Sequence, residues 1–98
     1  MIKLIRMKSG EDVIGDVTEI DSGYIVEKPA VLMPMPGSQG REMSMGMVPW
    51  QPFSKNTKFD IPADWVVTTS EPADDIENGY RTNFGSGIQV STNKLLVD

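Results

Sequence analysis

The sequence predicts an all-β domain, a small and strongly bent open barrel of five antiparallel strands, followed by one short helix. Apolar and polar residues alternate with a period of two in several stretches between residues 1 and 69, which is the spacing of half-buried strands. Turn-forming residues separate these stretches at short intervals. Gly15 interrupts the second stretch, and a glycine inside a strand is typical of a sharp bend or a close backbone approach. An early bend in so short a chain favours a highly curved barrel.

The first strand is expected over residues 2–7, where apolar and charged side chains alternate. A tight turn at Gly10 leads into a longer second strand over residues 13–20, bent at Gly15. The Asp-Ser-Gly segment at 21–23 predicts a hairpin turn, because aspartate opens turns and glycine tolerates positive φ.

A third strand is expected to begin at Tyr24, in a segment rich in strand-forming residues. Pro29 and Pro34 predict that its continuation is kinked or lies at an edge of the sheet. Residues 36–40 have no periodicity and predict a loop. The next strand is predicted from methionines at alternate positions, with their face turned inward: Met43, Met45 and Met47.

The last strands are expected at 59–61 and 65–69, parted by a turn at 62–64. The spacing then changes to that of a helix, predicted over 70–86 with Ser70 as its N-cap. Its apolar stripe falls at Ile76, Tyr80 and Phe84. Its acidic first turn, which suits the helix dipole, holds Asp74, Asp75 and Glu77.

At 98 residues the chain has room for a single domain, which we expect to span 1–98. It divides into the barrel over 1–69, the helix over 70–86, and residues 87–98 as either a final short strand or an unpacked tail. Two barrel types remain open, an SH3-like or Sm-type barrel and an OB-type barrel. The small core favours support from self-association.

The chain contains neither cysteine nor histidine. The commonest general base and the commonest metal ligand are therefore missing, together with thiolate nucleophiles and cysteine–zinc sites. We expect no enzyme activity, no cofactor and no metal ion. The net charge of −5 opposes nucleic-acid binding by the chain as a whole, although an oligomer can gather a few basic residues on one face. No apolar run is long enough to span a membrane, and the start lacks the apolar block of a signal peptide.

Two segments of the chain resemble the motifs of the Sm and Sm-like protein family. The first has the two glycines, the apolar residue and the aspartate of that family at Gly10, Gly15, Val17 and Asp21. The second matches apolar positions at Ile61, Val66 and Val67, with Pro62 and Ala63 in place of the family's arginine and glycine. Residues 47–50 (MVPW) and 84–88 (FGSGI) are similar to small uncharacterised Sm-like proteins of marine cyanophages.

The resemblance implies a five-stranded, strongly bent sheet and a homo-oligomeric ring. In that ring the fifth strand of one subunit pairs with the fourth of the next, which covers the strand edges. It also implies RNA binding at the pore, through the turn after the second strand and the turn between the last two. A phage origin places the protein in the cytoplasm of an infected bacterial host.

The candidate nucleic-acid-binding residues are Asp21, Tyr24, Lys55, Asn56 and Lys58. Asp21 matches the aspartate of the first motif. Tyr24 lies one position beyond the place of the family's base-stacking residue, and stacking contributes about 1–3 kcal/mol per base. Its alternative role is a strand residue at a subunit interface. The two lysines and Asn56 belong to a polar connection that either touches phosphate or is merely solvated. The family's base-binding asparagine and RNA-contacting arginine are absent.

Two functional classes follow from these observations. The first is an oligomeric Sm-like ring that binds nucleic acid, with RNA favoured over single-stranded DNA. The alternative is a protein-interaction or structural ring of a phage that binds no nucleic acid, for which a negative charge is expected. The charge at the pore distinguishes them, because a basic face favours the first class and an acidic face favours the second.

Overall fold

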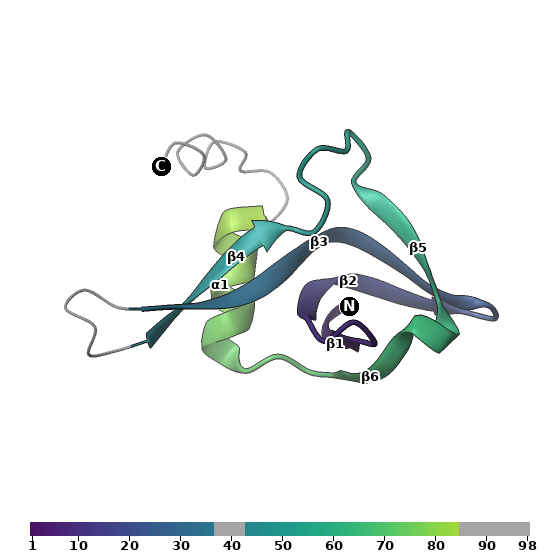
Figure 1. Cartoon of the computed structure of the whole chain (residues 1–98), viewed down its shortest axis with the longest axis horizontal. Helices are drawn as coiled ribbons and strands as arrows, with labels where there is room; N and C mark the ends of the chain where they lie inside the picture. The colour runs from purple at the N-terminus through teal and green to yellow at the C-terminus, as the bar shows by residue number, and fades with distance from the viewer. Residues whose placement is uncertain (37–42, 85–98) are drawn as a thin grey trace.

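The computed structural model describes residues 1–36 and 43–84, and it shows one antiparallel sheet of six strands with a single helix packed against it (Figure 1). The elements are β1 (Ile2–Met7), β2 (Asp12–Ile20), β3 (Gly23–Pro36), β4 (Met43–Pro49), β5 (Lys58–Pro62), β6 (Val66–Ser70) and α1 (Asp74–Phe84), with a 3₁₀ turn at Ala63–Trp65. The strand order is β4-β3-β2-β1-β6, and β5 also pairs with β3. The predicted small all-β fold with a short C-terminal helix is confirmed, and the sheet is not closed.

The long strand β3 organises the sheet. Its first half pairs with β2 on one side and β5 on the other, and its second half pairs with β4. The sheet has six strands and not the five of the expected barrel, and each of the six segments predicted as strands forms one of them. Strands β4 and β5 pair with different halves of β3.

A β-bulge bends β2 and β3 where the sequence predicts a bend, at Gly15. The register passes from Ile14 opposite Ala30 to Asp16 opposite Glu27, so Lys28 and Pro29 together face Gly15. Lys28 has a φ of 55°, the left-handed conformation that a bulge of this kind needs. A Cβ built on Gly15 would lie 2.6 Å from Cγ1 of Val26, so the close backbone approach predicted here is present.

The two tight turns at the ends of β2 also follow the prediction. Gly10 has a φ of 106°, which a residue with a side chain rarely adopts, and its N–H donates to the Met7 carbonyl at 2.8 Å. At the other end, Ile20 pairs with Gly23, so Asp21 and Ser22 form the hairpin turn.

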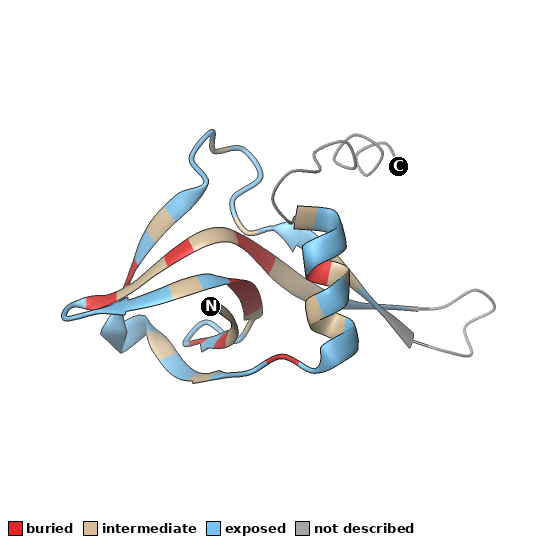
Figure 2. Cartoon of the chain, turned by 180° about the vertical axis from the view of Figure 1, so that it is seen from behind, coloured by how far each residue is buried: buried red, intermediate tan, exposed pale blue. Residues whose placement is uncertain are grey.

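Buried residues lie along the inner strands of the sheet and on α1 (Figure 2), and their apolar side chains form two clusters. The cluster on the concave side consists of Ile5, Met7, Val13, Val26 and Ile61. The cluster under the helix consists of Ile14, Ala30 and Tyr80. Neighbouring residues such as Val13 and Ile14 enter different clusters, because successive side chains of a strand point to opposite faces. The helix therefore covers the convex face of the sheet, and the concave face encloses its own cluster.

Helix α1 begins at Asp74, four residues after the predicted start at residue 70, and Ser70 is not its N-cap. Ser70 instead pairs with Leu4 as the last residue of β6, so its backbone belongs to the sheet. The predicted apolar stripe is confirmed, since Tyr80 is buried and Ile76 and Phe84 pack around it. The predicted final strand or tail, residues 87–98, lies outside the described residues.

The predicted inward methionine face is right for Met47 and wrong for Met45. Met47 packs in the cluster under the helix, whereas Met45 is 48% exposed. Both lie on the helix side of the sheet, since they pair with Leu32 and Pro34. The helix covers only the part of β4 nearest the core, which leaves Met45 beyond its reach. The side chain of Met43 lies outside what the structure describes.

Candidate functional site

The turn between β2 and β3 lies against the turn between β5 and β6. The Ala63 N–H donates to the Ser22 carbonyl at 3.1 Å. A Cβ on Gly23 would lie 2.8 Å from the Ala63 nitrogen and 3.0 Å from the Pro62 carbonyl carbon, so only glycine fits here. The fold thus brings together the two segments in which the resemblance implies a binding site.

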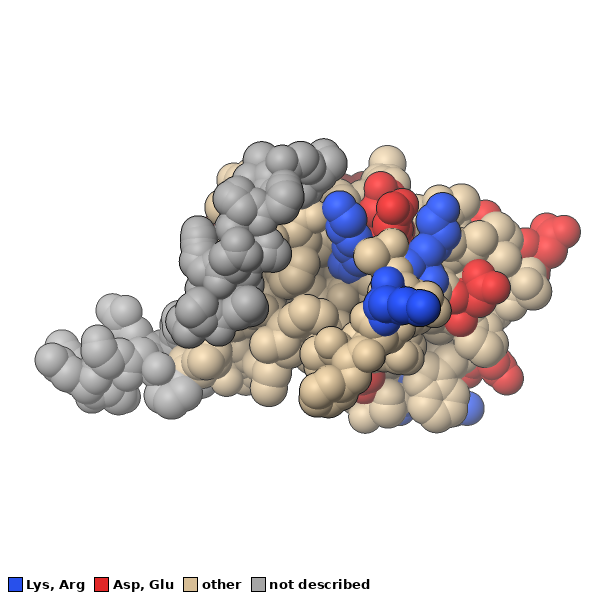
Figure 3. Space-filling view, turned by 90° about the horizontal axis from the view of Figure 1, so that it is seen from above, with Lys and Arg blue, Asp and Glu red and all other residues tan. Residues whose placement is uncertain are grey.

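Three acidic side chains are exposed at this end of the molecule, and Lys8 lies beside them with its ammonium 5.7 Å from the centroid of the Trp65 ring. Asp21 and Asp64 are exposed on the two turns, and Asp60 is exposed on the neighbouring strand β5. None of the three forms an ion pair with another residue in the described part of the chain. We call these three carboxylates the acidic end. Figure 3 shows acidic atoms spread over this end, on the right of the view, and a group of basic atoms nearer the middle.

Tyr24 lies beside the acidic end, and its side chain is partly buried. It stands in register between Glu19 of β2 and Ile61 of β5, and its half-buried ring packs against the concave core cluster. It lines a shallow cavity of about 210 Å³ together with Ile20, Ser22, Asp60, Ile61 and Pro62. Nearby carboxylates repel phosphate, so this ring is poorly placed to stack a base of RNA.

The other candidate residues lie at the opposite end of β5. Lys55 and Asn56 are exposed in the preceding loop, and Lys58 begins the strand opposite Glu27. Tyr24 is three register positions away from that pair, or about 10 Å along the sheet. The five candidate residues therefore fall into two separate groups and form no single site.

An aromatic groove adjoins the loop that contains Lys55 and Asn56. We call Lys55 and Lys58, together with Lys28, the lysine group. Trp50 and Phe59 meet edge to face, with ring centroids 5.5 Å apart. The groove has a volume of about 240 Å³, and its lining includes Pro29, Pro49, Pro52, Asn56 and Lys28. Lys28 is brought here by its backbone N–H, which donates to the Thr57 carbonyl at 2.6 Å. Sequence reasoning missed Lys28, because it is far along the chain from the loop that it meets.

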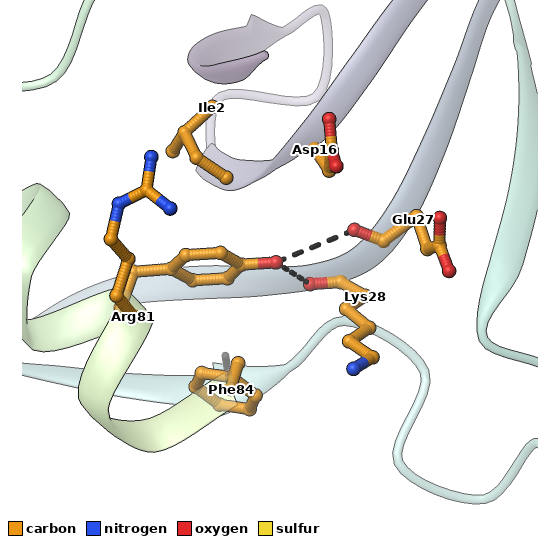
Figure 4. Close-up of a pocket in the computed structure, with 7 residues that line it drawn as sticks. Ile2, Asp16, Glu27, Lys28, Arg81 and Phe84 are labelled. Atoms are coloured by element: carbon orange, nitrogen blue, oxygen red, sulfur yellow. Dashed lines mark hydrogen bonds between the residues drawn. The ribbon is translucent and has the colours of Figure 1, made fainter. Parts of the chain in front are cut away.

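A second cavity, of about 300 Å³, lies between the helix and the bulge (Figure 4). The Tyr80 hydroxyl donates to the Lys28 carbonyl at 2.9 Å and approaches the Glu27 carbonyl at 3.4 Å. Burial of this hydroxyl raises the pKa of Tyr80 above its ordinary value.

Two of the four charged side chains that line this cavity have partners, whereas Glu27 and Lys28 form no ion pair among the described residues. Asp16 accepts from the amino group of Met1 at 2.7 Å, and Arg81 donates to Glu77 at 2.7 Å. The Tyr80 hydroxyl thus fixes the helix on the bulge.

Among residues 1–36 and 43–84, no cluster of three or more acidic side chains has the geometry to hold a metal ion. In the same residues, no helix combines the length and apolarity that a membrane crossing needs.

Fold and surface define a small all-β protein with an open six-stranded sheet, an acidic end and a separate lysine group. No family model matches the chain. A stretch of 44 residues is 46% identical to part of a component of eukaryotic translation initiation factor 3 from Drosophila melanogaster, and the match covers 45% of this chain and 8% of that protein. The corresponding protein of Drosophila simulans is 43% identical over 44 residues, with the same coverage. A match of this extent assigns the chain to no family.

Proposed function

We propose that the protein forms a ring of identical subunits through β5 and β6, and that the acidic end of the ring binds a basic segment of a partner protein. Each of these strands has one partner among the described residues, β3 for β5 and β1 for β6. Pairing β6 of one copy with β5 of the next continues the sheet from subunit to subunit and satisfies both edges.

The composition of β6 supports its use as an interface. The strand reads Val-Val-Thr-Thr-Ser and contains none of the charges that usually protect an exposed edge. Val67 is 63% exposed, and Trp65 just before the strand is 42% exposed. Apolar side chains on an unprotected edge favour burial against another strand.

The acidic end is the observation that carries the choice of partner. Each subunit contributes Asp21 and Asp64 from two connected turns and Asp60 from β5, so a ring repeats around its axis three carboxylates that form no ion pair among the described residues. Such a surface attracts a lysine- or arginine-rich segment and repels the phosphates of RNA.

The test measures binding of a lysine-rich 15-residue peptide by fluorescence anisotropy. Asp21→Asn with Asp64→Asn should weaken binding by about tenfold, which corresponds to about 1.4 kcal/mol. The matched control is Asp74→Asn with Asp75→Asn, which removes the same charge from the helix start and should leave the affinity within about twofold. Equal losses in both variants would show that only net charge matters, and they would refute the acidic end as a site.

Nucleic-acid binding is the second candidate function, and the lysine group is the observation that favours it. Lys28 lines the groove of Trp50 and Phe59, and Lys55 and Lys58 are chain neighbours of its lining residues Asn56, Thr57 and Phe59. Positive charge therefore lies near aromatic rings. If RNA or single-stranded DNA binds here, Lys55→Ala with Lys58→Ala should reduce the salt slope of binding by about 1 per lost contact. Tyr24→Ala should leave that slope unchanged, because Tyr24 lies with the acidic end. No binding of a 15-nucleotide strand at low salt would exclude this function.

A further inference from the structure

The second half of β3 and the whole of β4 form a two-stranded arm that is rich in methionine. The arm comprises residues 31–36 and 43–49, which read VLMPMP and MSMGMVP. Five of the seven methionines of the chain lie in these two segments, and none of its charged residues does. Apart from the hydroxyl of Ser44, the thioether sulfurs are therefore the only side-chain atoms of the arm with lone pairs to offer a ligand.

Two of these methionines lie side by side on one face of the arm. Directly paired residues share a face, so Met33 and Gly46 point to the same side. Met35 is two residues further along β3 and points to that side as well. Met33 is 45% exposed and Met35 is 48% exposed, so both side chains are accessible to an ion in solution.

Gly46 brings the two thioethers together. A Cβ at this position would collide with the sulfur of Met35, so that sulfur occupies the place which a side chain of residue 46 would take. Because Gly46 lies directly opposite Met33, this place is about 4.5–5.5 Å from the Cβ of Met33. The sulfur of Met33 is two bonds beyond its Cβ on a flexible side chain. It therefore reaches the far side of an ion that touches the sulfur of Met35.

The chemistry of the two donors selects the ion. Thioether sulfur is a soft and uncharged ligand, which favours Cu(I) over hard cations such as Mg²⁺ and Ca²⁺. Two sulfurs on opposite sides of an ion give the linear coordination that Cu(I) and its analogue Ag(I) accept. The chain contains no histidine and no cysteine, so neither imidazole nor thiolate competes for the ion. The net charge of −5 attracts a cation to the molecule as a whole.

We propose that Met33 and Met35 bind one Cu(I) ion, seated over Gly46. We call this pair the thioether site. It goes beyond the ring and the acidic end proposed above, and it shares no residue with either of them.

Met45 provides a matched comparison on the other face of the arm. It is as exposed as Met35, at 48%, but it lies opposite Pro34, so no glycine leaves room for a second sulfur there. Met47 shares the face of Met45, yet it packs in the cluster under the helix. Met45 therefore has the exposure of the thioether site without its geometry.

The first test follows the methionine methyl groups of the full chain by NMR during a titration with silver nitrate in chloride-free buffer. Met33→Leu and Met35→Leu assign the two signals of the thioether site, and Met45→Leu assigns the comparison. The signals of Met33 and Met35 should shift together and saturate at one Ag(I) per chain, whereas the signal of Met45 should stay in place. Parallel shifts of all three signals would show that silver binds any exposed methionine, and they would overturn the proposal.

The second test measures Cu(I) affinity without oxygen, in competition with the chromophoric chelator bicinchoninate. Met33→Leu and Met35→Leu should each weaken binding by at least about tenfold, because the second sulfur meets an ion that the first already holds, while Met45→Leu should stay within about twofold of wild type. Leucine keeps the size and apolarity of methionine, so only the ligand is lost. Wild-type affinity in either thioether-site variant, or an equal loss in Met45→Leu, would overturn the proposal.

Gly46→Ala tests the seat itself, since it keeps both thioethers. The new methyl group displaces the sulfur of Met35, which lies near the end of a flexible side chain, so the strand pair should stay intact by circular dichroism. Cu(I) affinity should fall as in Met35→Leu. Wild-type affinity in Gly46→Ala would contradict the pairing of the two sulfurs over Gly46.

Discussion

Gly15→Ala tests the bend on which the whole sheet depends. The new methyl group would lie 2.6 Å from Cγ1 of Val26, 3.2 Å from the carbonyl oxygen of Glu27 and 3.4 Å from Cα of Pro29. Val26 is fully buried, and the other two contacts are backbone atoms of the bulge, so no neighbour moves freely. Overpacking of this kind costs about 1–3 kcal/mol, and we expect about 2 kcal/mol for one methyl against three such neighbours.

Thermal unfolding followed by circular dichroism measures this loss. In a domain of this size 1 kcal/mol shifts Tm by about 4–8 °C, so Gly15→Ala should lower Tm by about 8–16 °C. All samples are compared at one protein concentration, because assembly makes Tm depend on concentration.

Gly79→Ala is the matched control. Its methyl group would meet only Cε of Met47, at an ordinary 3.4 Å, and alanine is the better helix former by about 1 kcal/mol. The same substitution should therefore raise Tm at position 79 and lower it at position 15. An unchanged Tm for Gly15→Ala would refute the close approach of β2 and β3.

Three further variants test the contacts around the bulge and the first turn. Lys28→Gly should raise the free energy of unfolding by up to about 1 kcal/mol in urea titration, because glycine adopts the φ of 55° without steric cost, and a loss would show that the side chain is needed. Tyr80→Phe should cost about 1 kcal/mol at neutral pH, since it removes the hydrogen bond to the Lys28 carbonyl. The raised pKa of Tyr80 also means that the unfolded chain ionises first, so wild-type stability should fall as pH rises above about 10, and Tyr80→Phe should fall less steeply. The hydrogen bond from the Ser9 hydroxyl lowers the pKa of Glu11, so the free energy of unfolding should decrease as pH falls through the acidic range. Glu11→Gln should remove part of that decrease. The same decrease in wild type and variant would contradict this reasoning.

The sequence predicted those features that depend only on neighbouring residues. The turns at Gly10 and at Asp21–Gly23, the close approach at Gly15 and the apolar stripe of the helix all depend on residue type or on spacing of a few positions. Each of these features is present in the structure.

Features that depend on distant partners could not be predicted in this way. Ser70 has the side chain of an N-cap, yet its pairing with Leu4 keeps it in the sheet. Met45 has the spacing of a core residue, but its burial depends on how far α1 reaches along β4. Periodicity shows which residues share a face, and it contains no information on what covers that face.

The arrangement of the candidate site residues likewise depends on contacts between distant parts of the chain. The structure places Asp21 beside the second motif segment, because both belong to turns that the strand pairing brings together. The sequence did not separate Tyr24 from the lysines, since their distance is set by the length of β5. Lys28 joins the lysine group through a backbone contact to Thr57, for which the sequence contains no signal.

The mass of the native assembly tests the proposed ring most directly. Native mass spectrometry of the wild-type chain should show a closed species of at least three copies of the 10.8 kDa chain. Val67 is skipped in the register of β6 with β1, so this is the position of β6 at which proline disturbs the pairing within one subunit least, and proline removes one backbone donor from the strand. Val67→Pro should reduce the species to single chains, and the matched Val67→Thr should keep the wild-type mass. A wild-type mass of 10.8 kDa at tens of micromolar, or an assembly that Val67→Pro leaves intact, would contradict the ring.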